Sequence, residues 1–280
     1  MASVSVVITS HDQGSLIAEA VESAWNQTLQ PAEVIVVDDG STDPRSIEEL
    51  RYLDADVIVQ QNAGVSAARN AGIRLAISEL VVVLDGDDRL APTFVEKTAA
   101  MMAADGELAA ASSWLRMFGV VDAVVAPSGG SAQDFLARNS CPANALIRRD
   151  RWRQAGGYDE SMRDGFEDWD FFLSLLEDGG RIGIVPEPLI EYRTSPVSAN
   201  VRSMAARMER VGDLIDRHAD LYARHMREAF LAWEARSIRV DLRREELLRR
   251  HPEEPLDQVS FGDGGMASAV RIASHRASTR

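Results

Sequence analysis

The sequence predicts an α/β fold in which a mostly parallel central sheet is covered by helices on both faces. Three observations lead to this prediction. Short runs of β-branched and aliphatic residues alternate with amphipathic helical stretches through the first 90 residues. These runs are apolar on both sides, as is typical of parallel strands buried between helices. The chain has 280 residues, and 45% of them are hydrophobic, which is enough to bury a core without disulfides.

The first half of the sheet is predicted element by element from this alternation. In the first helix an apolar stripe runs from Leu16 to Leu29, and Pro31 is expected to end it. Pro44 suits the first turn of the second helix. The expected strands are 4–9, 34–37, 57–59 and 80–84, and the helices between them are 14–29, a helix from about 44, and 65–78.

The middle of the chain is less regular. Pro186 and Pro188 lie between two short apolar runs. These runs are therefore predicted to be separate strands. Helices are expected over 93–104, 131–139 and 168–178, and strands over two parts of 108–126, 143–147, 182–185 and 189–192.

The pattern changes after residue 198. Residues 199–250 are almost continuously helix-forming and show no convincing heptad. The glycines and serines of 262–280 predict a loose tail. The predicted organisation is therefore a domain over 1–198, a helical extension over 199–261 and a flexible tail over 262–280. The extension is expected to pack against the domain or to form a homodimer.

Charge and cysteine content exclude several classes of protein. The chain has 44 acidic and 30 basic residues, and the whole acid excess lies in residues 1–200. A net charge of −14 argues against a nucleic-acid binder, which needs a basic surface for the phosphates. Cys141 is the only cysteine, so disulfide scaffolds and multi-cysteine zinc sites are excluded. No signal peptide or membrane-spanning run is visible, so a cytoplasmic protein is expected, with peripheral attachment to the inner membrane face as the alternative.

Two groups of acidic residues follow predicted strands, at the edge where parallel sheets bind ligands. Asp38 and Asp39 follow the second strand, and Asp85, Asp87 and Asp88 follow the fourth. Crowded carboxylates repel one another unless positive charge lies between them. They are therefore expected to hold a divalent cation or to hydrogen-bond a ribose and base, although strand-end acids also cap helices or face water.

A third acidic group, Glu167-Asp168-Trp169-Asp170, opens a predicted helix. Carboxylates suit the first turn of a helix, so a capping role alone would explain this group. However, the group follows a glycine-punctuated loop over 156–166, and such a loop is able to bring backbone close to a ligand. A ligand-facing role therefore stays open beside capping.

Six short motifs along the chain resemble, in order, those of family 2 glycosyltransferases, which are inverting enzymes with the GT-A fold. The resemblance covers roughly residues 3–195. It implies that 1–198 is a GT-A catalytic domain, with a nucleotide-sugar half over about 1–90 and an acceptor half over about 91–198. The motifs lie at 6–12, 36–43, 62–73, 84–88, 156–160 and 167–170.

The resemblance implies roles on the donor side. Thr9 and the backbone near His11 would line the nucleotide pocket, although many family members carry an aromatic residue in place of His11. Asp39 resembles the acid that reads the uracil ring, and Arg69 resembles a basic residue on the base side of the nucleotide. Asp85 resembles the acid near the ribose.

The remaining implied roles concern the diphosphate and the reaction. Asp87 resembles the acid that binds a metal between the two phosphates, which implies Mn²⁺ or Mg²⁺ as the cofactor. Arg193 resembles a late residue that closes over the diphosphate. Asp168 resembles the catalytic base, and the neighbouring Glu167 and Asp170 are expected to raise its proton affinity. Glu167 is also expected on the acceptor side. Trp169 either belongs to the core or lines the acceptor side.

The implied reaction is a single displacement that moves a sugar from a UDP-sugar to an acceptor. The donor sugar stays open, and so does the choice among a lipid-linked sugar, a polysaccharide, a small molecule or a peptide as the acceptor. The main alternative enzyme is a haloacid-dehalogenase-type phosphatase with Asp85 as nucleophile, but Lys97 is the only lysine. A nucleotidyltransferase would need a basic loop, and 9–16 contains no Arg or Lys. A non-catalytic nucleotide-sugar-binding module is the alternative from another class.

Overall fold

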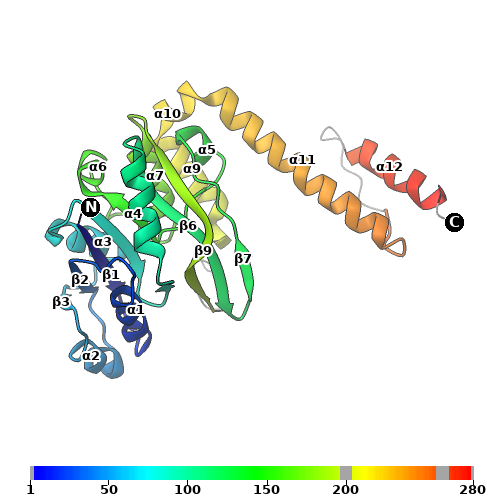
Figure 1. Cartoon of the computed structure of the whole chain (residues 1–280). Coiled ribbons are helices and arrows are strands. Elements are labelled where there is room, and N and C mark those ends of the chain that lie inside the picture. Colours follow the sequence, from blue (N-terminus) through cyan, green and yellow to red (C-terminus); the bar gives the residue numbers. More distant parts are fainter. Residues whose placement is uncertain (1–2, 196–203, 257–264, 279–280) are drawn as a thin grey trace. The chain divides into compact units, whose positions relative to one another are not determined.

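The computed structural model describes residues 3–195, 204–256 and 265–278. The chain divides into two compact units, residues 1–224 and 225–280. The first unit contains the sheet and the helices up to α10, and the second contains α11 (Met226–Arg250) and α12 (Gly265–Ser278) (Figure 1).

The first unit is built, within the described residues, on a nine-stranded sheet with the order β3-β2-β1-β4-β8-β6-β9-β5, and β7 pairs with β6. The pairs β1–β2, β1–β4 and β2–β3 are parallel, which confirms the parallel start of the sheet. Beyond β4 the sheet is mixed, because β8 is antiparallel to both β4 and β6. The strands are β1 (Val4–Ser10), β2 (Glu33–Asp38), β3 (Asp56–Val59), β4 (Leu80–Asp85), β5 (Arg89–Leu90), β6 (Leu108–Gly119), β7 (Ala123–Val125), β8 (Ala145–Arg148) and β9 (Arg181–Thr194).

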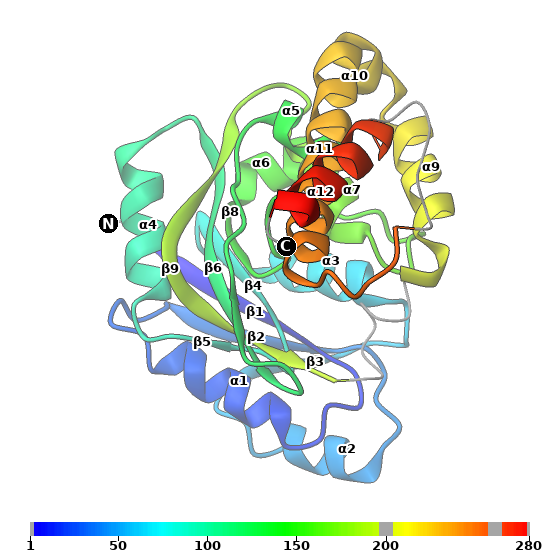
Figure 2. The same cartoon turned by 90° about the vertical axis from the view of Figure 1, so that its right-hand side faces the viewer.

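Helices cover both faces of the sheet, as the sequence predicts. α1 (Leu16–Trp25) and α4 (Phe94–Ala104) pack on one face, and α3 (Val65–Leu75) lies on the opposite face (Figure 2). The other helices of this unit are α2 (Pro44–Leu50), α5 (Ala132–Phe135), α6 (Arg149–Gln154), α7 (Glu167–Leu176), the 3-10 helix η1 (Met204–Ala206), α9 (Arg207–Arg217) and α10 (Ala219–Arg224).

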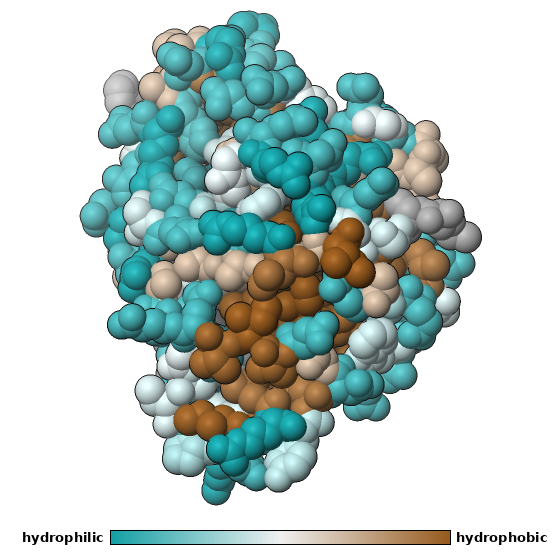
Figure 3. Space-filling view, turned by 90° about the vertical axis from the view of Figure 1, so that its left-hand side faces the viewer, coloured by the Kyte–Doolittle hydropathy of each residue, from teal (hydrophilic) through white to brown (hydrophobic). Residues whose placement is uncertain are grey.

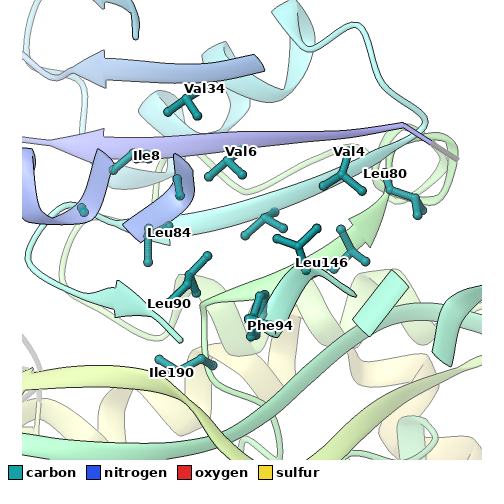
Figure 4. Close-up of a cluster of buried hydrophobic side chains, with 14 of the residues drawn as sticks. Val4, Val6, Ile8, Val34, Leu80, Leu84, Leu90, Phe94, Leu146 and Ile190 are labelled. Atoms are coloured by element: carbon teal, nitrogen blue, oxygen red, sulfur yellow. The ribbon is translucent and has the colours of Figure 1, made fainter. Parts of the chain in front are cut away.

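The core on the α1 face consists of aliphatic side chains from alternate strand positions. Val6, Ile8, Leu84 and Leu146 point into it and are fully buried (Figure 4). On the other face, a Cβ at Gly72 of α3 would lie 2.3 Å from a methyl carbon of Val7. Glycine therefore lets α3 approach β1 more closely than any other residue would.

The first helix is shorter than expected, because α1 ends at Trp25 rather than near residue 29. Gln27 explains this difference. Its side-chain amide donates to the carbonyl oxygens of Ser23 and Ala91 and accepts from the backbone N–H of Val95. These bonds tie the chain after α1 to the start of α4, and they end the helix before Pro31 is reached.

The two short strands expected on either side of Pro186 and Pro188 form one long strand, β9. β9 pairs along β6, and the register shifts where Trp114 faces Pro188. A bulge of this kind accommodates residues that cannot donate to the ladder, so the prolines bend the strand without ending it.

The C-terminal region also differs from the prediction of a loose tail over 262–280. Residues 265–278 form α12, which packs on α11 through the buried Glu245. The Glu245 carboxylate accepts from Ser268 Oγ at 2.9 Å and from Arg271 Nη2 at 2.8 Å. The predicted domain boundary near residue 198 and residues 262–264 lie outside the described residues.

Some hydrophobic side chains stay on the surface. Figure 3 shows hydrophobic residues gathered on one face of the molecule. Val59 of the edge strand β3, together with Leu75 and Ile77 at the end of α3, is among the exposed apolar residues. In the described part of the chain, no helix has the length and apolar character needed to cross a membrane.

Candidate functional site

The two strand-end acidic groups lie at one edge of the sheet. In the parallel register Ser10 of β1 faces Asp38 of β2, and Thr9 faces Asp85 of β4. β1 therefore stands between the two groups, with Thr9 Oγ1 3.5 Å from an Asp85 carboxylate oxygen. The structure brings together the residues that the sequence assigns to donor binding at the carboxyl edge, where ligands of open parallel sheets bind.

Asp39 organises the loop that leads into α3. Its buried carboxylate accepts hydrogen bonds from the backbone N–H groups of Ala63 and Gly64 and from Gln60 Nε2, each at 2.8 Å. Gly64 has φ of 96°, a conformation that favours glycine. Asp39, the acid expected to bind the uracil ring, thus also holds the loop over residues 60–64 in place.

The neighbouring loop 11–12 is tied to residues 41–43. Asp12 accepts from the backbone N–H groups of Thr42 at 2.7 Å and Asp43 at 2.8 Å. The bond from Asp43 lowers the pKa of Asp12. The His11 ring is 46% exposed and lies 3.4 Å from the side-chain nitrogen of Asn62. His11 therefore stands at the open side of the predicted nucleotide pocket.

The turn after β4 is held by an asparagine that the sequence analysis does not identify. Asn144 Oδ1 accepts from the backbone N–H of Asp85 at 3.1 Å, and its Nδ2 donates to Asp88 at 2.7 Å. Asp88 is almost fully buried and also accepts from the backbone N–H of Arg193 at 2.8 Å. A Cβ at Gly86 would lie 2.6 Å from the Thr9 carbonyl oxygen, so this turn requires glycine.

Asp87 lies in the same turn, between Gly86 and Asp88. Burial, followed by the charge of Asp85, raises its pKa, and the nearby Arg193 lowers it. The Arg193 guanidinium donates to the Asp87 backbone oxygen at 2.9 Å and to Glu19 at 2.7 Å, and it lies 4.6 Å from the centre of the Phe118 ring. Arg193 is thus beside the predicted metal ligand, but Glu19 partly neutralises it.

Arg69 connects the donor edge to the start of α7. Its side chain is only 2% exposed, and it donates to Asp85 and to Glu167, both at 2.8 Å. Burial alone would lower the pKa of Arg69, but Asp85 and Glu167 raise it well above its usual value. Arg69 therefore lies between two carboxylates, whereas the resemblance implies a role on the base side of the nucleotide.

The first turn of α7 begins with an unusual backbone conformation. Phe166 precedes it with φ of 70°, a left-handed conformation that is uncommon for a residue other than glycine. The Trp169 side chain that follows is 2% exposed and donates from Nε1 to the Phe135 carbonyl oxygen at 2.7 Å. Trp169 therefore lies in the core, and its side chain anchors the first turn of α7 to the Phe135 backbone.

Asp168, the predicted base, is a half-buried carboxyl that accepts hydrogen bonds from two donors. Asn139 Nδ2 donates to one oxygen at 2.8 Å, and the backbone N–H of Trp169 donates to the other at 2.8 Å. Burial, followed by the neighbouring Glu167 charge, raises the pKa of Asp168 to about 7, against the lowering effect of Arg69. A carboxylate with this pKa accepts a proton effectively near neutral pH.

Sequence reasoning missed Asn139, Asn144 and His218, and it did not distinguish the structural role of Asp88 from its neighbours. Asn139 and Asn144 belong to an irregular stretch between a short helix and a strand, and His218 lies beyond the predicted domain. Asp88 was noted only as part of the acidic group. No spacing connects these residues to the motifs, because their partners are 29 to 105 residues away.

The site offers limited ligands for a metal. Among the described residues, no group of three or more His, Cys, Asp or Glu side chains is arranged to hold a metal ion. A cation at Asp87 would need the phosphates of a bound donor as further ligands. Mg²⁺ commonly binds in this way, through one or two carboxylates together with substrate phosphates, so a single available carboxylate fits such a cation.

Two family models match the chain. The model described as glycosyl transferase family 2 matches residues 5–150, and the model described as glycosyltransferase like family 2 matches residues 108–212. The uncharacterized glycosyltransferase YwdF of Bacillus subtilis (strain 168) is 27% identical over 207 residues, which cover 70% of this chain and 76% of that protein. The UDP-Gal:alpha-D-GlcNAc-diphosphoundecaprenol beta-1,3-galactosyltransferase of Escherichia coli is 27% identical over 215 residues, which cover 71% of this chain and 76% of that protein.

Solved structures of S. aureus TarS 1-349 share the fold. The complex with UDP-GlcNAc has a TM-score of 0.62 at 17% identity and covers 81% of this chain and 72% of that chain. The complex with UDP has a TM-score of 0.61 at 18% identity and covers 98% of this chain and 82% of that chain. At this level of identity the likeness shows a common architecture.

Proposed function

Since the chain belongs to glycosyltransferase family 2 and has the GT-A fold, we propose that it transfers a sugar from a UDP-sugar to an acceptor hydroxyl by one inverting displacement. The observation that carries this proposal is the connection of Asp168 to the donor edge. The half-buried Asp168 carboxyl, with a pKa of about 7, is joined to Asp85 through Glu167 and Arg69. Family membership also removes the grounds for the phosphatase alternative.

The donor is proposed to lie along the carboxyl ends of β1, β2 and β4. Asp39 and the loop it organises would face the base, and Thr9 and Asp85 would face the ribose. Two likenesses support a uridine nucleotide: TarS was solved with UDP-GlcNAc, and the name of the E. coli relative specifies UDP-Gal.

The diphosphate needs positive charge in this acidic site. Arg193 would supply part of it, but in this structure Glu19 shares that guanidinium. We therefore assign Asp87 as the protein ligand of Mn²⁺ or Mg²⁺ bound together with the donor phosphates. When bound, the cation would offset charge that develops on the departing diphosphate.

Asp168 is proposed to take the proton of the acceptor hydroxyl as this oxygen attacks the anomeric carbon. The bond to the UDP oxygen breaks in the same step, and the proton stays on Asp168 until solvent removes it. Asn139 holds the Asp168 side chain in place. The pKa of Asp168 near neutrality suits a general base. The acceptor is left open. A lipid-linked saccharide, the class named for the E. coli relative, would place the protein at the inner membrane face.

A donor screen tests this proposal. UDP-sugars with Mn²⁺ should raise the melting temperature, and the stabilising donor should be transferred or slowly hydrolysed with release of UDP. The Asp168→Asn variant should bind UDP normally but lose turnover, whereas Asp178→Asn in the exposed turn after α7 should retain turnover. Unchanged turnover in Asp168→Asn, or a complete lack of UDP binding by the wild type, would contradict the proposal.

A further inference from the structure

The segment α9–α10, which follows the sheet in the sequence, packs along the loop that leads to the proposed base. Residues 207, 210, 214 and 217 of α9 recur every three or four positions, so they share one face of the helix. Leu214 on this face is fully buried. α9 therefore belongs to the first compact unit.

Three arginines on this face contact the loop at successive points. Arg210 Nη2 lies 3.0 Å from Asp164, and Arg217 forms an ion pair with Asp159. Arg207 lies over the Phe166 ring, 5.7 Å from its centre. Since Gly156, Gly157 and Gly165 leave this loop with few intrinsic restraints, these contacts restrict its path into α7.

His218, between α9 and α10, reaches the first turn of α7 itself. Its Nε2 lies 3.0 Å from Asp170 Oδ1, and both side chains are buried, with exposed fractions of 7% and 8%. A buried carboxylate without a hydrogen-bond donor is strongly unfavourable, so His218 determines where the Asp170 side chain can rest. Asp170 is two residues from Asp168 on the same turn.

The four residues of this turn are each held by a different part of the chain. Glu167 is held by Arg69, Asp168 by Asn139, Trp169 by the Phe135 carbonyl and Asp170 by His218. Of these four holding groups, His218 is the one contributed from beyond the sheet. It approaches α7 from the side of α9–α10, which also holds the preceding loop.

We propose that His218 is a positioning residue for the base, and that α9–α10 holds the loop 159–166 and the first turn of α7 in the geometry that Asp168 needs. This inference rests on the proposed function, because it takes Asp168 as the group that accepts the acceptor proton. His218 acts through Asp170 and does not touch the reacting atoms.

The test compares His218→Ala, His218→Gln and Leu221→Ala in the full chain. Leu221 of α10, three residues further along the chain, is also buried but has no polar side-chain group that could bond Asp170, so its truncation controls for lost stability alone. Since small misplacements of catalytic groups cost up to ~100-fold in rate, His218→Ala should lower kcat at least about tenfold with the donor KM within about twofold. His218→Gln, which keeps a side-chain N–H for Asp170, should restore most of kcat.

A His218→Ala kcat within about twofold of the wild type overturns the inference. So does an equal loss of kcat in Leu221→Ala, when each variant is assayed at the same number of degrees below its own melting temperature. If His218→Ala does not fold, His218→Leu combined with Asp170→Leu removes the pair without leaving a buried charge and is measured instead. Failure of the proposed function is distinct, because the wild type itself would then turn over no UDP-sugar.

A separate observation concerns α11 in the second unit. Positions 226, 230, 233, 237, 240, 244 and 247 are spaced alternately by four and three residues, which is the seam of a coiled coil. Ser237 and Arg244 interrupt it and hide the pattern in the sequence. Its apolar members include Met226, Phe230, Val240 and Leu247, which are 57%, 61%, 60% and 51% exposed.

We infer that a second copy of this chain covers the seam, with the two α11 helices parallel. In that arrangement Arg236 of one copy faces Asp241 of the other on both sides of the seam. An antiparallel pair would instead bring Arg236 close to Arg236 or Arg243, and Glu234 close to Asp241. Charge complementarity between Arg236 and Asp241 therefore favours the parallel dimer, in which Arg244 is the seam position that brings like charges together.

Light scattering on the full chain should show a dimer, which Val240→Asp converts to a monomer. Leu231→Asp, an exposed position off the seam, should stay dimeric. Under a mild thiol oxidant, Ser237→Cys should crosslink to its own copy, because like positions meet only in a parallel pair, and Cys141 is buried. A monomeric wild type or a dimeric Val240→Asp would overturn the dimer, and absence of the crosslink would overturn the parallel orientation.

Discussion

The donor edge and the first turn of α7 are held in different ways. On the predicted base side of the donor edge, away from Asp85, Asp12 and Asp39 are bound mainly by backbone N–H groups of nearby loops within the first 64 residues. On α7, Glu167, Asp168 and Asp170 are bound by side chains 98, 29 and 48 residues away. Local backbone bonds create a preformed pocket, whereas long-range side-chain bonds make the base depend on the packing of the whole unit. Changes at the donor edge should therefore affect binding, and changes at α7 should affect turnover.

The largest expected effect is on turnover at α7. Asp168→Asn should lower kcat about 10²- to 10⁴-fold, because proton removal from the acceptor is lost. UDP affinity should stay within about twofold, since Asp168 is not at the donor edge. Steady-state kinetics together with UDP titration measure both quantities.

Loss of stability would not explain this result. The pKa of Asp168 is raised by folding, so its contribution to stability is present at low pH and is lost as the pH rises through about 7. The Asn variant has no group to ionise there and should not melt below the wild type at pH 8. A kcat of Asp168→Asn near that of the wild type would contradict the distinction between the donor edge and the first turn of α7.

Asp39→Asn tests the donor edge. Hydrogen bonds to a charged acceptor are worth about 1.5–3 kcal/mol, so loss of the charge should weaken UDP binding about 10- to 100-fold. kcat at saturating donor should change little, because the α7 turn is untouched. Asp56→Asn on the exposed edge of β3 is the matched control and should bind UDP as the wild type does. A pure kcat effect in Asp39→Asn would contradict the comparison.

Gly72→Ala tests the packing beneath the donor edge. The new Cβ would lie 2.3 Å from Val7 Cγ1, so α3 must move away from β1. Overpacking of this kind should lower the free energy of unfolding by about 1–3 kcal/mol in a denaturant titration. Gly106→Ala meets no atom within 4 Å and should leave the stability nearly unchanged. Equal stability of the two variants would show that α3 does not need its close approach.

The smallest expected effect is on the pH dependence of turnover. Asp168 accepts a proton only when ionised, so kcat should rise with pH through about 7 and then level off. Glu167→Gln removes a negative neighbour and should move this rise to lower pH. The shift should be partial, because burial, the largest cause of the raised pKa, remains. An unmoved or upward-shifted profile would contradict the electrostatic account of α7.

The sequence alone was a good guide to the donor edge and a partial guide to α7. Buried strands such as Val34–Val37 and Leu80–Leu84, and the acids that follow them, are visible because a parallel sheet imposes local alternation and places strand ends at one edge. Asp168 was identified by its motif, but Asn139 and His218 were not, because no local pattern connects a side chain to a partner dozens of residues away.

The C-terminal region shows the same limit. One uninterrupted helix-forming stretch was read as a single extension, yet α9–α10 belongs to the first unit and α11–α12 forms the second. Helix propensity predicts a helix but does not say which face will find a partner. Only the packing of Leu214 and His218 into the first unit divides the stretch.

The sequence by itself determined the β–α alternation, the acidic strand ends and the family motifs, because these depend on spacing along the chain. The tertiary structure decided that Arg69 lies between Asp85 and Glu167, that Asp168 is buried enough to raise its pKa to about 7, and that His218 supports the turn through Asp170. Desolvation and hydrogen bonding depend on distance in space, and that distance exists only once the sheet and its helices have packed.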